Sequence, residues 1–183
     1  KKVLIEFEGV YMNAEVWFND NFLGRHPYGY TSFAYDLTPY LKPGEDNILT
    51  VKVDNACQRN SRWYSGSGIY RHVWLWVADP IHVGQWGVYV TTPEVSDESA
   101  TVRVETTLAN ETDGKTKVTV RARILDAGDE EVAAAETELD VPGNGYATGV
   151  QELEIADFFF NDTATTEIYT MVTEVVRDGQ VTD

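Results

Sequence analysis

Short runs in which apolar and polar residues alternate, separated by polar turn clusters, cover almost the whole chain. The pattern begins in residues 1–10, where Val3, Ile5 and Phe7 alternate with Leu4, Glu6 and Glu8. A period of two puts the apolar side chains on one face of a β-strand, whereas a helix repeats its apolar positions every three or four residues. No run approaches the roughly 18 apolar residues that a membrane-spanning helix needs. The pattern therefore predicts an all-β protein.

The first half of the chain predicts several strands and one clear hairpin. Asn19 and Asp20 stand between two short apolar runs and tolerate the left-handed backbone of a tight turn. Further strands are expected at 32–37, at 47–55 and at 72–77. In the last of these, Val73, Leu75 and Val77 should share one face, and His72, Trp74 and Trp76 should share the other.

The amino-acid composition changes near Asp79 and Pro80, after which aromatic residues become sparse. Strands of modest length follow at 86–95, 100–110, 116–127 and 130–141, separated by polar turn clusters, as is typical of a β-sandwich. Residues 130–139, EEVAAAETEL, have a composition that favours a helix. We interpret them as a strand, because they lie between strands and carry no capping signal. The sequence thus predicts two β-domains, 1–79 and 80–183.

Composition excludes several classes of function. The 183 residues include 30 acidic and 14 basic side chains, a formal net charge of −16, which argues against binding to nucleic acid or to an anionic membrane. The single cysteine, Cys57, excludes an internal disulfide and a multi-cysteine zinc site. His26, His72 and His82 lie far apart without a second ligand at metal spacing, so each is expected to have an ordinary structural partner. We predict no metal and no cofactor.

Residues 158–170, FFFNDTATTEIYT, interrupt the pattern with three phenylalanines and a threonine-rich run. Residues 161–170 resemble the in-frame translation of a widely used sequencing-adapter oligonucleotide. We interpret 158–170 as artefactual sequence and read no function from it. The alternative is a genuine but unusual strand and loop.

Residues 61–77, SRWYSGSGIYRHVWLWV, place aromatic and guanidinium groups beside glycines, immediately before a strand. A plain turn needs a Gly or an Asn and none of these larger groups. Sugars present an apolar face and a polar rim, and Asn60, Arg62, Trp63 and Tyr64 supply an aromatic platform with hydrogen-bond donors. They are the candidate substrate-binding residues. Alternatively, Trp63 and Tyr64 pack at a domain interface while Arg62 forms a salt bridge.

Several stretches carry a family resemblance. Residues 9–55 and, most specifically, 61–75 (SRWYSGSGIYRHVWL) resemble the N-terminal sugar-binding jelly roll of glycoside hydrolase family 2, which includes β-galactosidases, β-glucuronidases and β-mannosidases. Residues 82–96 and 100–111 resemble the start of the immunoglobulin-like sandwich that follows in those enzymes, and residues 141–157 and 168–180 resemble its continuation. The resemblance implies a partial galactose-binding-like jelly roll followed by an immunoglobulin-like β-sandwich.

The resemblance also implies a function. In family members the loop that matches 60–64 contacts the sugar at the mouth of a TIM barrel that carries two catalytic glutamates. One branch of the family has an acidic residue at the position of Arg62, which leaves the glycone preference open. We expect no catalytic residue in this chain, because that barrel is missing. The chain would be a non-catalytic fragment of a β-galactosidase-like O-glycosyl hydrolase, supplying scaffold and part of the substrate-binding wall.

Its partners would then be a β-glycoside in the longer parent protein and the catalytic barrel in cis, with oligomerisation possible. A free-standing carbohydrate-binding module and a β-sandwich interaction domain are the alternatives. The chain opens without Met on KKVLIEFEGV, which reads as a strand already under way. We therefore expect an internal piece of a longer protein, lacking the first jelly-roll strands. The sequence leaves the compartment open between bacterial periplasm and cytoplasm.

Overall fold

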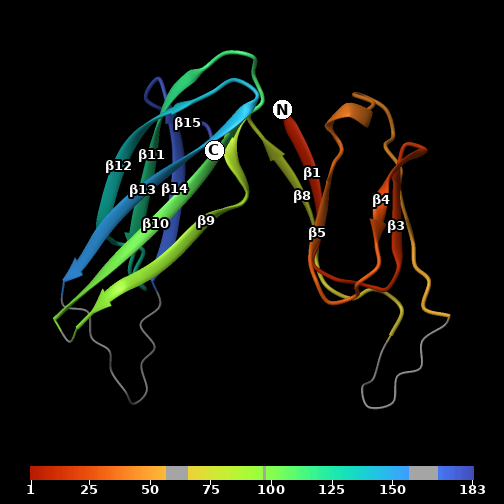
Figure 1. The fold of residues 1–183 in the computed structure, drawn as a ribbon, viewed down its shortest axis with the longest axis horizontal. Coiled ribbons are helices and arrows are strands. Elements are labelled where there is room, and N and C mark those ends of the chain that lie inside the picture. The colour runs from red at the N-terminus through yellow and green to blue at the C-terminus, as the bar shows by residue number, and fades with distance from the viewer. Residues whose placement is uncertain (57–65, 97, 157–168) are drawn as a thin grey trace. The chain divides into compact units, whose positions relative to one another are not determined.

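A computed structural model describes residues 1–56, 66–96, 98–156 and 169–183 (Figure 1). Within these residues the chain is all-β, as predicted, with a single short 3-10 helix, η1 (Thr38–Tyr40), and no α-helix. The chain divides into two compact units, Lys1–Ala78 and Asp79–Asp183. No helix in the described ranges has the length and apolar character to cross a bilayer.

The described part of the first unit contains eight strands, most of them short. They are β1 (Lys2–Phe7), β2 (Val10–Tyr11), β3 (Ala14–Phe18), β4 (Asn21–His26), β5 (Phe33–Asp36), β6 (Leu49–Lys52), β7 (Gly68–Ile69) and β8 (Val73–Ala78). Two three-stranded antiparallel sheets, in the orders β5-β1-β8 and β4-β3-β6, make up the body of the unit, and β2 pairs with β7. Ile5 and Phe7 from β1 share one apolar core with Val16 and Phe18 from β3.

The hairpin predicted at Asn19 and Asp20 is confirmed between β3 and β4. Both turn residues have the positive φ angles, 47° and 66°, that Asn and Asp tolerate best. The Asn19 side chain also donates to the Tyr40 carbonyl (2.8 Å) and accepts from the Ile48 amide (2.9 Å). One turn residue therefore fixes the hairpin and the start of the next strand.

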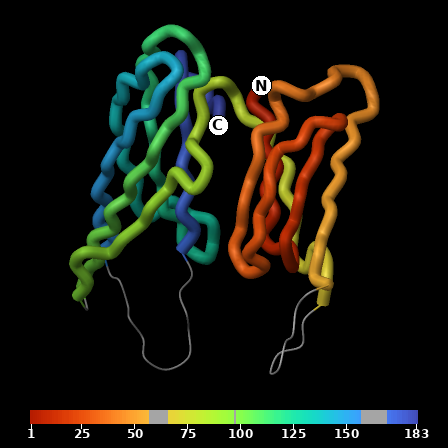
Figure 2. The backbone as a smooth tube through the Cα atoms, turned by 45° about the vertical axis from the view of Figure 1, so that its right-hand side comes forward, coloured from red at the N-terminus to blue at the C-terminus, as the bar shows by residue number. Residues whose placement is uncertain are grey.

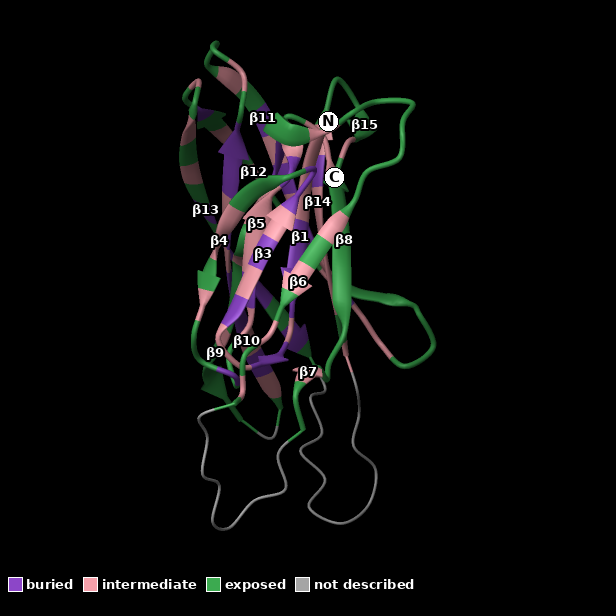
Figure 3. Cartoon of the chain, turned by 90° about the vertical axis from the view of Figure 1, so that its right-hand side faces the viewer, coloured by how far each residue is buried: buried purple, intermediate pink, exposed green. Residues whose placement is uncertain are grey.

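β8 has the predicted division of faces but not the expected burial. Val73, Leu75 and Val77 lie opposite Phe7, Ile5 and Val3 of β1, which puts all three on the core side of the sheet. They are nonetheless 39%, 64% and 58% exposed, and most of β8 is coloured as exposed in Figure 3. The reason is topological: β8 is an edge strand, and among the described residues no strand pairs with its far side.

In the second unit the strands lie close to the predicted ranges, except that the first begins at Ile81 and not at residue 86. They are β9 (Ile81–Val95), β10 (Ser99–Asn110), β11 (Thr116–Leu125), β12 (Glu131–Val141), β13 (Gly145–Ala156), β14 (Thr170–Arg177) and β15 (Gln180–Val181). Their sheets have the orders β13-β10-β9 and β12-β11-β14-β15, and Figure 2 traces both. β12 confirms that the alanine- and glutamate-rich segment is a strand, with alternate residues more buried. Here the period of two outweighs helix propensity.

Most of the segment 158–170 lies outside the described residues, and its interpretation as artefact stays a prediction. Its last two residues are described. Tyr169 packs against a core cluster of the second unit that includes Val104 and Ile124, and Thr170 begins β14.

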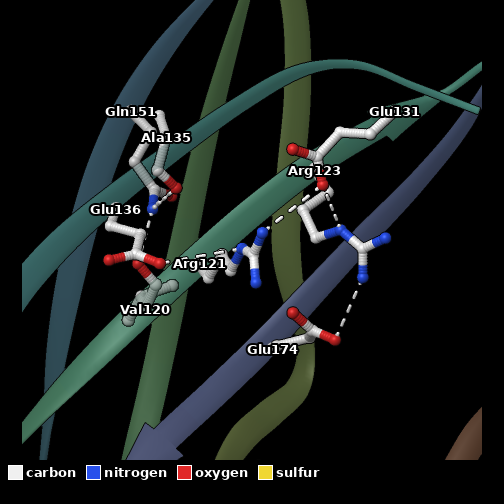
Figure 4. Close-up of polar contacts among 8 residues, drawn as sticks. All are labelled: Val120, Arg121, Arg123, Glu131, Ala135, Glu136, Gln151 and Glu174. Carbon is white, nitrogen blue, oxygen red and sulfur yellow. Dashed lines mark hydrogen bonds and ion pairs between the residues drawn. The ribbon is translucent and has the colours of Figure 1, made fainter.

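Polar contacts join the strands of the second unit both inside and outside (Figure 4). On the outer face, the Glu131 carboxylate accepts from Arg123 (2.7 Å) and Arg121 (3.4 Å), and Arg123 also contacts Glu174 (3.4 Å), which joins β11 to β12 and β14. Inside, the buried Gln151 amide on β13 spans the sandwich. It donates to the carbonyls of Val120 (2.9 Å) and Ala135 (3.2 Å) in the opposite sheet.

Candidate functional site

The predicted substrate-binding residues, Asn60, Arg62, Trp63 and Tyr64, fall in 57–65, outside the described residues, as does Cys57. Their contacts with a sugar therefore stay a prediction. The structure does describe both ends of the segment and the side chains around them. These define where on the first unit the segment is anchored.

The two ends of the segment are tied together. The Asn55 side chain donates to the Ser67 hydroxyl (2.9 Å), and the Ala56 amide donates to the Asp54 carboxylate (3.0 Å). Directly after Ser67, β7 pairs with β2, with Gly68 opposite Tyr11. Gly68 has a φ of +115°, a conformation that favours glycine, which explains why β7 begins with a glycine. The segment thus begins and ends at one hydrogen-bonded anchor.

Four tyrosines gather beside this anchor. Tyr11, on β2, lies 5.3 Å from Tyr30 between ring centroids, and Tyr30 lies 5.6 Å from Tyr28, both in edge-on geometry. Tyr70, which follows β7, donates its hydroxyl to the Gly29 carbonyl (2.6 Å). Tyr11 is buried, whereas the other three expose half or more of their surface. We call Tyr11, Tyr28, Tyr30 and Tyr70 the tyrosine cluster.

Glycines allow the rings to approach the backbone. A Cβ atom on Gly29 would overlap the Tyr11 ring, and one on Gly9 would lie 2.6 Å from Cζ of Tyr70. A residue with a Cβ atom would therefore fit at Gly29 or Gly9 only if the neighbouring tyrosine ring moved. The cluster is therefore built on two glycines that admit close packing of an aromatic ring.

The phenol of Tyr30 stays protonated at neutral pH. A hydrogen bond with Tyr11 raises the pKa of Tyr30, with further contributions from burial and from the neighbouring phenols. A neutral phenol offers a hydroxyl that donates and accepts, beside an apolar ring face. That combination suits a neutral polyhydroxyl ligand.

Sequence reasoning singled out 60–64 and missed the tyrosine cluster. A local signal did exist: residues 26–32, HPYGYTS, place Tyr28 and Tyr30 on either side of a glycine. Their meeting with Tyr11 and Tyr70 depends on the pairing of β2 with β7, which joins residues nearly 60 positions apart and leaves no local trace.

The histidines have ordinary partners. His26 contacts the Thr31 hydroxyl (3.0 Å), His72 contacts Glu8 (3.0 Å), and the buried His82 contacts the Asp79 carbonyl (2.8 Å). In the ranges that the structure describes, no three His, Cys, Asp or Glu side chains are grouped so that they could hold a metal ion.

Each of the two all-β units corresponds to a domain of one known protein family. Residues 1–80 match the sugar-binding domain of glycosyl hydrolases family 2, and residues 82–183 match a second domain of the same family. The chain belongs to glycosyl hydrolase family 2.

Relatives of known sequence include β-galactosidases and β-glucuronidases. β-Galactosidase BoGH2A of Bacteroides ovatus is 49% identical over 98% of this chain, and a β-glucuronidase of Formosa agariphila is 35% identical over 78%. A crystal structure of a family 2 member from Bacteroides cellulosilyticus superposes with a TM-score of 0.92 at 35% identity over the whole chain. The chain spans only 21%, 16% and 25% of these three proteins. It is homologous to their N-terminal domains, and their catalytic domain has no counterpart in these 183 residues.

Proposed function

We propose that this chain is the non-catalytic N-terminal part of a β-galactosidase-like family 2 glycosidase. In that role it supplies the scaffold and part of the substrate-binding wall for hydrolysis of an O-glycosyl bond. Asn60, Arg62, Trp63 and Tyr64 contact the sugar of a β-glycoside. The catalytic TIM barrel, in the same longer protein, supplies the reaction.

The observation that carries this proposal is the anchor of segment 57–65. Its two ends are joined by the Asn55–Ser67 hydrogen bond and stand beside the tyrosine cluster. A segment fixed at both ends loses less conformational entropy when it binds a ligand than a free one. The tyrosine side chains beside it would extend the aromatic and hydroxyl chemistry of 60–64.

Hydrolysis itself needs two carboxylates about 5–9 Å apart on either side of the scissile bond. Acidic residues are common in this chain, but those with described partners hold strands and turns, as Glu131 does for Arg121 and Arg123. We expect the two catalytic glutamates in the part of the longer protein that lies beyond these residues.

A domain exchange tests the proposal. Residues 1–80 would replace the matching segment of the Bacteroides ovatus β-galactosidase, which is 49% identical across the chain. We expect the chimera to fold and to hydrolyse an aryl β-galactoside with kcat/KM within about tenfold of the parent. The reason is that residues 1–80 would supply the same scaffold and the same part of the binding wall as the segment they replace. A folded chimera without activity would contradict the proposed role.

The alternative is a free-standing carbohydrate-binding or β-sandwich interaction module. Leu75 and Val77, on the core side of β8, are more than half exposed. This exposure favours a chain that is part of a larger sandwich over a free-standing module. The inactive chimera is the result that would favour this alternative.

A further inference from the structure

The outer face of β1 and β8 carries a row of aromatic and carboxylate groups that the proposed function does not use. Trp74 and Trp76 project from β8, and Glu6 and Glu8 lie across from them on or just after β1. The Trp74 indole donates to Glu8 (2.9 Å) and the Trp76 indole donates to Glu6 (3.1 Å). His72 contacts the other oxygen of Glu8 (3.0 Å).

The register shows that both indoles are held in the same way. Trp74 lies directly opposite Glu6 but donates to Glu8, and Trp76 lies opposite Leu4 but donates to Glu6. Each indole therefore leans toward the residue two positions further along β1. The shared lean repeats one geometry along the strand, at the roughly 7 Å spacing of next-but-one residues.

The hydrogen bonds leave the ring faces available. Each indole N–H already has an acceptor, so the aromatic surface is what the side chains offer to solvent. Trp74 is 48% exposed and Trp76 is 53% exposed, which is high for a residue type that is usually well buried. The His72 ring stacks on Trp74 with centroids 5.4 Å apart and extends the row by one ring. The result is a rigid aromatic platform on regular secondary structure.

The charges at the platform select the class of ligand. Hydrogen bonds from Trp74 and His72 lower the pKa of Glu8, so its carboxylate is ionised and can accept hydrogen bonds from hydroxyl groups. The Glu8 carboxylate at the platform and a net charge of −16 on the chain repel anionic glycans. Indole faces pack on the apolar faces of pyranose rings, and successive sugar units suit a repeated platform.

We propose that Trp74 and Trp76, with Glu8 at one end, form a second carbohydrate-binding surface that takes a neutral oligosaccharide along β8. The buried Glu6 holds the Trp76 indole in place and does not face the ligand. The surface goes beyond the substrate-binding wall proposed above, because it involves none of residues 60–64. It would hold a polysaccharide chain on a regular sheet face while a separate site acts on it.

Calorimetric titration of the whole 183-residue chain tests this surface. The probes are neutral β-linked hexasaccharides of glucose, galactose and mannose, with an oligogalacturonate as the anionic comparison. We expect at least one neutral probe to bind and the anionic probe to bind at least tenfold more weakly. Trp74→Ala and Trp76→Ala should each weaken that binding roughly tenfold, while Trp74→Phe should keep most of it.

Trp86→Ala is the matched control, because Trp86 is 67% exposed but lies on β9 of the second unit. It should leave the affinity unchanged, and a thermal melt of each variant separates lost binding from lost folding. Absence of binding by any neutral probe, in a folded chain, would overturn the proposal. So would tight binding of an oligolysine in place of the sugars, which would assign the platform to cations.

One further outcome separates this surface from the proposed function. If sugar binding survives Trp74→Ala and Trp76→Ala but disappears with Arg62→Ala, the platform is wrong and the loop site stands. Binding that is lost with the tryptophans and kept in Arg62→Ala supports the platform independently of the loop.

Discussion

At the scale of single residues, Gly29 supports the tyrosine cluster through its lack of a side chain. Changing Gly29 to Ala would press a methyl group into the Tyr11 ring and displace the carbonyl that Tyr70 contacts. We expect the free energy of unfolding of the first unit to fall by about 1–3 kcal/mol, as for other overpacked sites. Denaturant titration followed by near-ultraviolet circular dichroism would measure it.

Gly66 is the matched control, because a Cβ atom there would meet no atom of the described residues within 4 Å. Gly66→Ala should be neutral or slightly stabilising, since it lowers the entropy of the unfolded chain. Equal losses in the two variants would show that the close packing at Gly29 has no energetic weight.

Asp36 should make the first unit sensitive to acid. Partial burial alone would raise its pKa, but hydrogen bonds from Thr38 and Lys2, together with the Lys2 charge 3.0 Å away, lower it below the ordinary value. A carboxyl with a lowered folded pKa adds stability above its unfolded pKa, and this is lost as pH falls through the folded value.

The free energy of unfolding, measured from pH 7 down to pH 3, should therefore show a wild-type advantage over Asp36→Asn that shrinks below about pH 4. Parallel profiles for the two proteins would mean that the ion pair and the Thr38 bond do not act on stability through this carboxyl.

At the scale of the elements, Gln151 connects the two sheets of the second unit. Its buried amide donates to the carbonyls of Val120 and Ala135 (Figure 4). Gln151→Met removes both bonds and should cost about 1–3 kcal/mol. Gln151→Glu should cost more at pH 7, because an ionised carboxylate would face two carbonyl oxygens in the core.

The pH dependence distinguishes these effects. Burial raises the pKa of a carboxyl, so the unfolded state of Gln151→Glu ionises first as pH rises, and the folded state loses stability. The gap between the Glu and Met variants, measured by urea unfolding, should be largest at pH 7 and should shrink toward pH 4. A gap independent of pH would contradict a core position for this side chain.

The sequence predicts individual strands better than it predicts their neighbours. The turn at Asn19 and Asp20 and the faces of β8 follow from local pattern. β12 follows from its place between strands without a capping signal, in spite of its helical composition. The exposure of Leu75 depends instead on which strand lies beyond β8. The tyrosine cluster and the cross-sheet bonds of Gln151 likewise depend on pairings between distant residues, which no local pattern encodes.

At the scale of the whole molecule, the two units should differ in stability. Phe7 and Val16 are fully buried in the core of the first unit, but Val73, Leu75 and Val77 on the core side of its edge strand β8 are exposed. Exposed core surface contributes little to stability, so we expect the first unit to unfold at lower denaturant than the second.

Amide hydrogen exchange of the intact chain would compare β3 with β11, the central strands of one sheet in each unit. We expect β3 to exchange through openings of lower free energy, and residues 1–79 alone to be poorly stable. A cooperative melt of that isolated piece with dispersed amide signals would contradict this expectation.

The central claim is that this chain forms part of the substrate-binding wall of a glycosidase, and Arg62 tests it most directly. The measurement is kcat/KM of the Bacteroides ovatus chimera with and without Arg62→Ala, with Lys52→Ala as a control, because Lys52 is an exposed cation paired with Glu15. If Arg62 binds the sugar, its loss should weaken transition-state binding by about 1–3 kcal/mol, which lowers kcat/KM roughly 5- to 150-fold. The Lys52 variant should match the unmodified chimera. An unchanged kcat/KM in Arg62→Ala would contradict the claim and return Arg62 to a structural role.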